Sequence, residues 1–83
     1  MPSRVHIPAR LHTHIRIVCD MMLKTHYFDE AHWVWMAVGS PQLCQTPGAH
    51  RALRSGMKIA GEFGFPDVAS WIESTIFAAH RAG

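Results

Sequence analysis

Ala49–Ala79, AHRALRSGMKIAGEFGFPDVASWIESTIFAA, is the stretch that decides the fold. Apolar residues recur at helical spacing on both sides of the corner Gly64-Phe65-Pro66. Glycine is favoured as the left-handed residue after a helix, and proline suits the first turn of the helix that follows. The stretch therefore predicts two amphipathic helices, over about 47–63 and 66–81, joined by a tight turn.

A second pair of helices is predicted before this stretch. One apolar stripe recurs at i, i+4, i+7 and i+11, and its members are Leu11, Ile15, Val18 and Met22. It predicts a helix over about 8–25. A shorter apolar run predicts a helix over about 30–38, which Gly39, Ser40 and Pro41 would end.

Four short helices with brief connections favour a compact all-α bundle. The length of 83 residues fits a single domain over 1–83. We expect the first and last helices to pair in the centre, because their apolar faces are the widest. The alternation over Ser3–Ile7 is compatible with a short N-terminal extended segment that Pro8 would end.

Several residues predict how the helices begin and end. Asp29 is the expected N-cap of the second helix, and Thr46 is the expected N-cap of the third, with Pro47 at its first position. Gly64 is expected in a left-handed conformation that closes the third helix. Gly56 and Gly61 either weaken that helix or let another helix approach it closely, and the sequence leaves both interpretations open.

The composition and the distribution of charge exclude some classes of function. The chain is 48% hydrophobic and only 17% charged, against about 25% charged in average globular domains. Net charge is positive over residues 1–28 and 47–61 and negative over 29–46 and 62–83, so no concentrated basic tract is present. No secretory signal or membrane-spanning run is visible, and we expect a cytoplasmic protein.

Seven histidines and two cysteines raise the question of a metal or thiol site. His12, Cys19 and His26 recur every seven residues, but seven residues of helix span about 10 Å, so no two could share an ion within one helix. Cys44 and His50 would be the candidate nucleophile and base, without an identifiable third group. An exposed Cys44 would be able to form an intermolecular disulfide. The sequence predicts no enzyme, no metal and no cofactor.

The three tryptophans are the most informative aromatic residues of the sequence. Trp33 and Trp35 point about 200° apart on a helix, so they cannot be equally buried. We expect Trp35 and Trp71 in the core, and Trp33 with Met36 in a partly exposed patch that could anchor a partner.

Arg51, Arg54 and Lys58 stand at i, i+3 and i+7 on the third helix. Such a row is either a solvated outer face or a contact with phosphate or with an acidic protein groove. The sequence leaves both interpretations open.

Gly64–Ile72, GFPDVASWI, within His50–Ile76 resembles the helix pair of ribbon-helix-helix DNA-binding proteins. The resemblance covers about a third of the chain, and it implies a dimer that reads DNA with a strand placed directly before the first helix of the pair. In this chain that place is Pro41–Gly48, where two prolines and a glycine oppose a strand. We therefore transfer no functional residue from that family.

The leading hypothesis is a small non-enzymatic module that binds a protein or ribonucleoprotein and acts by steric occlusion. Inhibitors from phages and mobile elements, anti-CRISPR proteins among them, share this general profile. The alternative is a dimeric DNA-binding regulator or antitoxin, and a homodimer is compatible with either hypothesis. The predicted partner-binding residues are Trp33, Met36, Arg51, Arg54 and Lys58.

Overall fold

The computed structural model describes residues 6–78 of the chain. They form four α-helices, which are α1 (Ala9–Lys24), α2 (Phe28–Gly39), α3 (Pro47–Glu62) and α4 (Pro66–Ile72). A 3₁₀ turn at Pro41–Cys44 links α2 to α3, and a π-helical turn at Glu73–Phe77 continues α4. The predicted all-α bundle of four short helices is confirmed, and residues 6–78 contain no strand.

Both ends of the chain carried a prediction that the structure does not reach. The expected extended segment falls mainly on residues 3–5, which lie outside the described residues, as do residues 79–81 at the expected end of the fourth helix. His6 and Ile7, which precede α1, form no regular structure.

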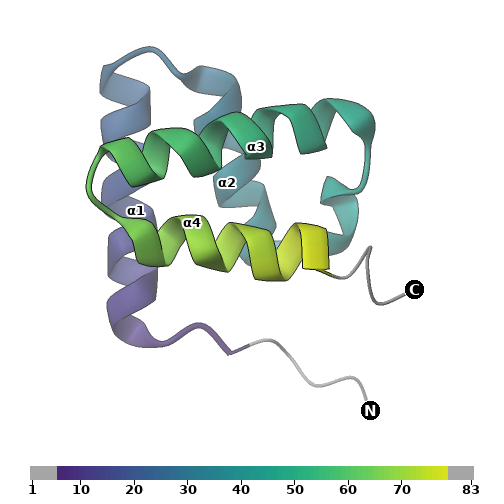
Figure 1. The fold of residues 1–83 in the computed structure, drawn as a ribbon, viewed down its shortest axis with the longest axis horizontal. Coiled ribbons are helices and arrows are strands. Elements are labelled where there is room, and N and C mark those ends of the chain that lie inside the picture. The colour runs from purple at the N-terminus through teal and green to yellow at the C-terminus, as the bar shows by residue number, and fades with distance from the viewer. Residues whose placement is uncertain (1–5, 79–83) are drawn as a thin grey trace.

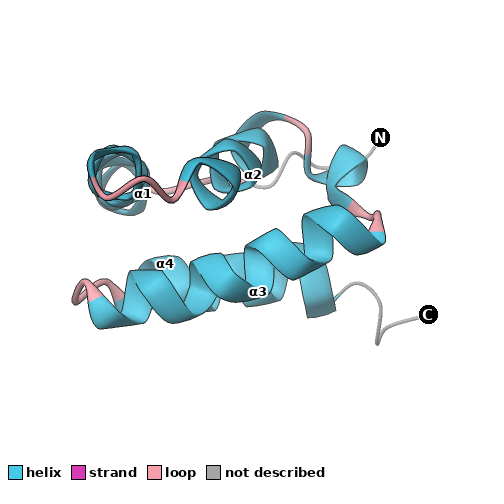
Figure 2. Ribbon diagram, turned by 90° about the horizontal axis from the view of Figure 1, so that it is seen from above, coloured by secondary structure: helices cyan, strands magenta, loops and turns pink. Residues whose placement is uncertain are grey.

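The helices form two hairpins that stack as two layers (Figures 1 and 2). α1 and α2 pack side by side as one hairpin, and α3 and α4 pack side by side as the other. In Figure 1 the α3–α4 hairpin runs across the α1–α2 hairpin, and in Figure 2 the two layers are seen edge-on. Short connections dictate this arrangement, because each helix turns back on its sequence neighbour.

The expected central pairing of the first and last helices is wrong. α1 packs chiefly on α2, α4 packs chiefly on α3, and the larger contact between the two hairpins joins α2 to α3. A Cβ added to Gly56 of α3 would stand 3.1 Å from Cγ2 of Val34 in α2. The absent side chain therefore lets these two helices approach closely, which settles the role of Gly56 that the sequence left open.

The core lies between the two layers. Its fully buried side chains come from all four helices, and they include Ile15, Met22, Val34, Leu53, Val68 and Ile72. No polar or charged residue of the described chain is buried. Each large apolar side chain removed from water contributes about 1.5–3 kcal/mol. None of the described helices is long and apolar enough to cross a membrane.

The corner between α3 and α4 is a Schellman motif, and it has the left-handed glycine that the sequence predicts. Gly64 is left-handed, with a φ of 95°. Its N–H donates to the carbonyl of Gly61 at 3.0 Å, and the N–H of Phe65 donates to the carbonyl of Ala60 at 2.9 Å. These are the two bonds that define the motif, and they satisfy carbonyls that the helix end would leave open.

The corner between α1 and α2 has the same geometry without a glycine. His26 takes the left-handed position with a φ of 67°, and its N–H donates to the carbonyl of Leu23 at 3.2 Å. The N–H of Tyr27 donates to the carbonyl of Met22 at 2.8 Å. The turn is tighter than the sequence suggested, so α2 begins at Phe28 and its N-cap is Tyr27.

The predicted N-cap at Asp29 is therefore wrong. Asp29 lies in the first turn of α2, where its charge favours the positive end of the helix dipole without capping it. The predicted cap at Thr46 is confirmed, since its Oγ1 accepts the N–H of Ala49 at 3.1 Å and Pro47 opens α3. The two helix starts differ because Tyr27, which follows the His26 corner, is the N-cap of α2 and its side chain makes no capping hydrogen bond.

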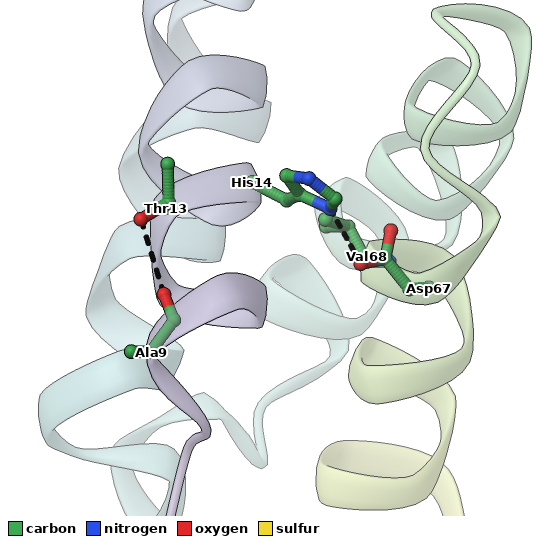
Figure 3. A network of polar contacts seen from close by, with 5 residues as sticks. All are labelled: Ala9, Thr13, His14, Asp67 and Val68. Carbon is green, nitrogen blue, oxygen red and sulfur yellow. Dashed lines mark hydrogen bonds and ion pairs between the residues drawn. The ribbon is translucent and has the colours of Figure 1, made fainter.

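A polar contact fastens α1 to the start of α4 (Figure 3). His14 Nδ1 donates to Asp67 Oδ2 at 2.6 Å, and the other oxygen of that carboxylate accepts the N–H of Val68 at 2.9 Å. Partial burial raises the pKa of Asp67, but the hydrogen bonds from His14 and Val68 outweigh it, and the pKa lies below its ordinary value of 3.8. The contact ties one hairpin to the other.

Candidate interaction surfaces

The basic row, Arg51, Arg54 and Lys58, is exposed on α3. It lies on the side of the helix opposite the buried Leu53 and Gly56. The ion pairs recorded among the described residues join His14 to Asp67 and Lys24 to Asp20, so none of them neutralises the row.

Arg54 is held within this row by an aromatic ring. Its guanidinium carbon lies 5.0 Å from the centre of the Phe77 ring, in a cation–π contact. The contact holds the guanidinium of Arg54 against the π-helical turn that continues α4. Arg51 and Arg54 together border a hollow at the start of α3, next to Thr46 and His50.

A second hollow, the α2–α3 hollow, brings Trp33 and Arg51 together. It has a volume of about 530 Å³ and is also lined by Asp29 and Glu30 from α2 and by Ser55 from α3. Ser55 Oγ donates to Glu30 Oε2 at 2.8 Å, which holds the two walls in register. An indole, an arginine and two carboxylates thus border one concave site.

Three of the five predicted partner-binding residues do not line this hollow, and one of them, Arg54, borders the hollow at the start of α3 instead. Met36 is half-buried and lines a different hollow, beside Trp35 and His32. Lys58 is exposed farther along α3. Trp33 is itself half-buried, because it packs on the edge of the core.

The core position predicted for Trp35 is wrong, and the one predicted for Trp71 is confirmed. Trp35 is 46% exposed, whereas Trp71 is buried. The inner face of α2 is filled by Ala31, Val34 and Ala37, and Trp35 lies about 100° around the helix from Val34. The small inner residues place α2 close to α3 and turn the bulky indole outward.

Trp35 belongs to an open groove between α1 and α2, the α1–α2 groove, which has a volume of about 780 Å³. Four large apolar side chains that line it are between 41% and 58% exposed, namely Ile17, Leu23, Phe28 and Trp35. Arg16 and Asp20 are its charged members. The sequence interpretation missed this site, although Ile17 and Leu23 stand off the buried stripe of α1 and signal a second apolar face.

The cysteines do not form a reactive site in the structure. Both are buried, and burial raises the pKa of the Cys44 thiol and raises the pKa of Cys19 to about 11. Cys44 donates to the carbonyl of Ser40, while His50 contacts Gln45. Cys44 therefore lacks the exposure that an intermolecular disulfide would require.

The histidines pack on aromatic rings instead of on one another. Five imidazoles of the described chain have an aromatic neighbour, in the pairs His12–Trp35, His14–Phe65, His26–Phe28, His32–Trp33 and His50–Phe77. Within residues 6–78, no three histidine, cysteine or acidic side chains gather as a metal site. Four of these five ring pairs are edge-to-face, and His14 and His50 also make polar contacts, with Asp67 and Gln45.

Compared with protein-family models, with curated proteins and with solved structures, the chain matches none of them.

Proposed function

We propose that this protein is a binding module that acts by contact and steric occlusion of a protein or ribonucleoprotein partner. The observation that carries the proposal is the α2–α3 hollow, which Trp33 and Arg51, the first cation of the basic row, line together. Large aromatic and arginine side chains dominate binding energy at protein interfaces. Trp33 and Arg51 lie on different helices, and the fold brings them to one concave site.

The charge of this surface suggests the chemistry of the partner. Arg51, Arg54 and Lys58 point outward with no ion pair among the described residues. Exposed cations without an ion pair increase the rate of association with an acidic surface, and they fix the orientation of that surface in the complex. The partner we propose presents carboxylates to the basic row and inserts an apolar side chain beside Trp33, with no carboxylate of its own against Asp29 and Glu30.

Capture from the source cell tests the proposal with two variants of equal charge. R51E/K58E reverses two cations of the row, and R10E/K24E reverses two exposed cations of α1. Arg54 is left unchanged because it also packs on Phe77. We expect one discrete partner to be retained by the wild type and by R10E/K24E and to be lost with R51E/K58E. Equal loss with both variants, or no partner for the wild type, contradicts the proposal.

DNA binding is the second candidate, and the exposed row favours it. A row of three cations at i, i+3 and i+7 is able to follow phosphates along a groove. Binding to duplex DNA would then fall steeply as salt rises. If the wild type fails to bind duplex DNA at about 50 mM salt, this candidate is removed.

A further inference from the structure

The α1–α2 groove is not used by the proposed function, and its composition is that of an interface. Ile17 and Leu23 of α1 and Phe28 and Trp35 of α2 line it together, each about half exposed. Soluble monomers seldom expose large apolar side chains in one contiguous patch. Because α1 turns its buried Ile15 and Val18 toward the α3–α4 layer, the groove lies on the outer side of the α1–α2 hairpin.

The outer side of this hairpin is large enough for a stable contact. α1 has 16 residues and is therefore about 24 Å long, and two packed helices are about 20 Å wide. A specific dimer buries about 800 Å² per protomer, which is about a seventh of the total surface of 5475 Å². One face of a two-helix layer supplies an area of that order.

The charges of the groove are arranged so that the surface complements itself. Arg16 and Asp20 are both exposed, both line the groove, and stand one helical turn apart on α1. A two-fold axis at the level of Val18 reverses the direction of α1 in the second copy. Arg16 of each copy then faces Asp20 of the other, and Ile17 lies next to its own counterpart.

Self-complementarity of this kind is what a two-fold interface requires. A uniformly acidic or basic partner would place a like charge against either Asp20 or Arg16, which is unfavourable at an interface. Asp20 already accepts from Lys24 at 3.0 Å. Its carboxylate has further lone pairs, so it is able to accept from an arginine as well.

We propose that a second copy of this chain covers the α1–α2 groove, in an antiparallel two-fold dimer held by reciprocal Arg16–Asp20 pairs around an apolar centre. The basic row of α3 lies in the other layer and stays accessible in this dimer. The inference therefore stands or falls independently of the proposed function.

Charge reversal followed by mixing tests the dimer. R16E and D20K each place like charges across the two-fold axis, twice per dimer, and we expect each to weaken self-association about a hundredfold. When the two variants are mixed, the introduced glutamate faces the introduced lysine at one contact, and the native pair is retained at the other. Sedimentation equilibrium should show two monomers that form a heterodimer of wild-type affinity on mixing.

A second pair of variants tests the apolar centre. Trp35→Ala removes an indole of the groove, whereas Leu43→Ala removes an exposed side chain that does not line it. We expect only Trp35→Ala to dissociate the dimer, with far-UV circular dichroism unchanged in both. A wild type that stays monomeric up to about millimolar concentration overturns the proposal. So does a dimer that neither the charge reversals nor Trp35→Ala weakens, because another face would then form it.

Discussion

The two hairpins turn through the same Schellman geometry, yet they expose different kinds of side chain to solvent. The α3–α4 hairpin turns at Gly64 and exposes a row of cations, with its apolar residues directed inward. The α1–α2 hairpin turns at His26 and exposes Leu23 and Trp35 in an open groove. The same two backbone hydrogen bonds thus form with either residue at the corner, while the exposed face depends on how each helix is rotated against the other layer.

The largest expected effect comes from the same substitution made in each hairpin. Leu53→Ala empties a fully buried site between the layers, and we expect it to lower the free energy of unfolding by about 2–5 kcal/mol. Leu23→Ala removes a side chain that is half exposed, and we expect about 0.5 kcal/mol or less in the monomer. Urea unfolding at concentrations that keep the protein monomeric measures both. Equal losses would mean that the groove is part of the core.

The two corners provide the next test. Gly64→Ala forces a Cβ into the left-handed region and should lower the free energy of unfolding by about 1–2 kcal/mol. His26→Gly relieves the same strain at the other corner and should raise the free energy of unfolding by about 0.5–1 kcal/mol. The loss of the ring contact between His26 and Phe28 reduces this gain. Thermal unfolding followed by circular dichroism should shift in opposite directions for the two variants. A shift in the same direction would show that the corners are not equivalent.

Substitutions at the starts of α3 and α2 should change the free energy of unfolding less, and by unequal amounts. Thr46→Ala removes a cap that accepts a backbone N–H, and we expect a loss of about 1 kcal/mol in the free energy of unfolding. Asp29→Ala removes only a favourable charge in the first turn of α2, and we expect about 0.3 kcal/mol. The comparison is made by urea unfolding at neutral pH. A larger loss for Asp29→Ala would restore it as a cap.

The smallest expected effect is a contribution to stability that is lost in acid. Because the pKa of Asp67 is lowered in the folded protein, its contribution to stability is complete above its ordinary value of 3.8 and is lost as the pH falls through the folded pKa. Asp67→Asn should therefore lower stability at pH 6, and the difference from the wild type should shrink below about pH 4. Urea midpoints measured across this range provide the check. A difference independent of pH would remove His14 and Asp67 as an ionic link between the hairpins.

Much of the fold was predictable from local patterns. The stripe through Ile15 and Val18 predicts α1, and the Gly64-Phe65-Pro66 corner predicts the turn between α3 and α4. Thr46 with Pro47 predicts the start of α3. These signals are reliable because each depends on a few neighbouring residues and on backbone geometry that any tertiary structure must satisfy.

The candidate sites were only partly predictable. The exposure of the basic row follows from helical spacing, since its members lie opposite Leu53. The meeting of Trp33 with Arg51, and the exposure of Trp35, depend on how closely α2 approaches α3 at Gly56. No local pattern contains that distance. The His26 corner was missed for a related reason, because a histidine carries no signal for a left-handed turn as strong as that of glycine.

The sequence by itself determined that this chain forms four short helices and that α3 carries an outward row of cations. It also determined where three of the helices begin or end. Only the tertiary structure decided which helices meet between the two hairpins, which tryptophan faces water, and that Arg16 and Asp20 share one groove with exposed apolar side chains. Periodicity reports which side of a helix is apolar, because that depends on spacing along the chain. It does not report what that side packs against, because packing depends on the shapes of residues distant in the sequence.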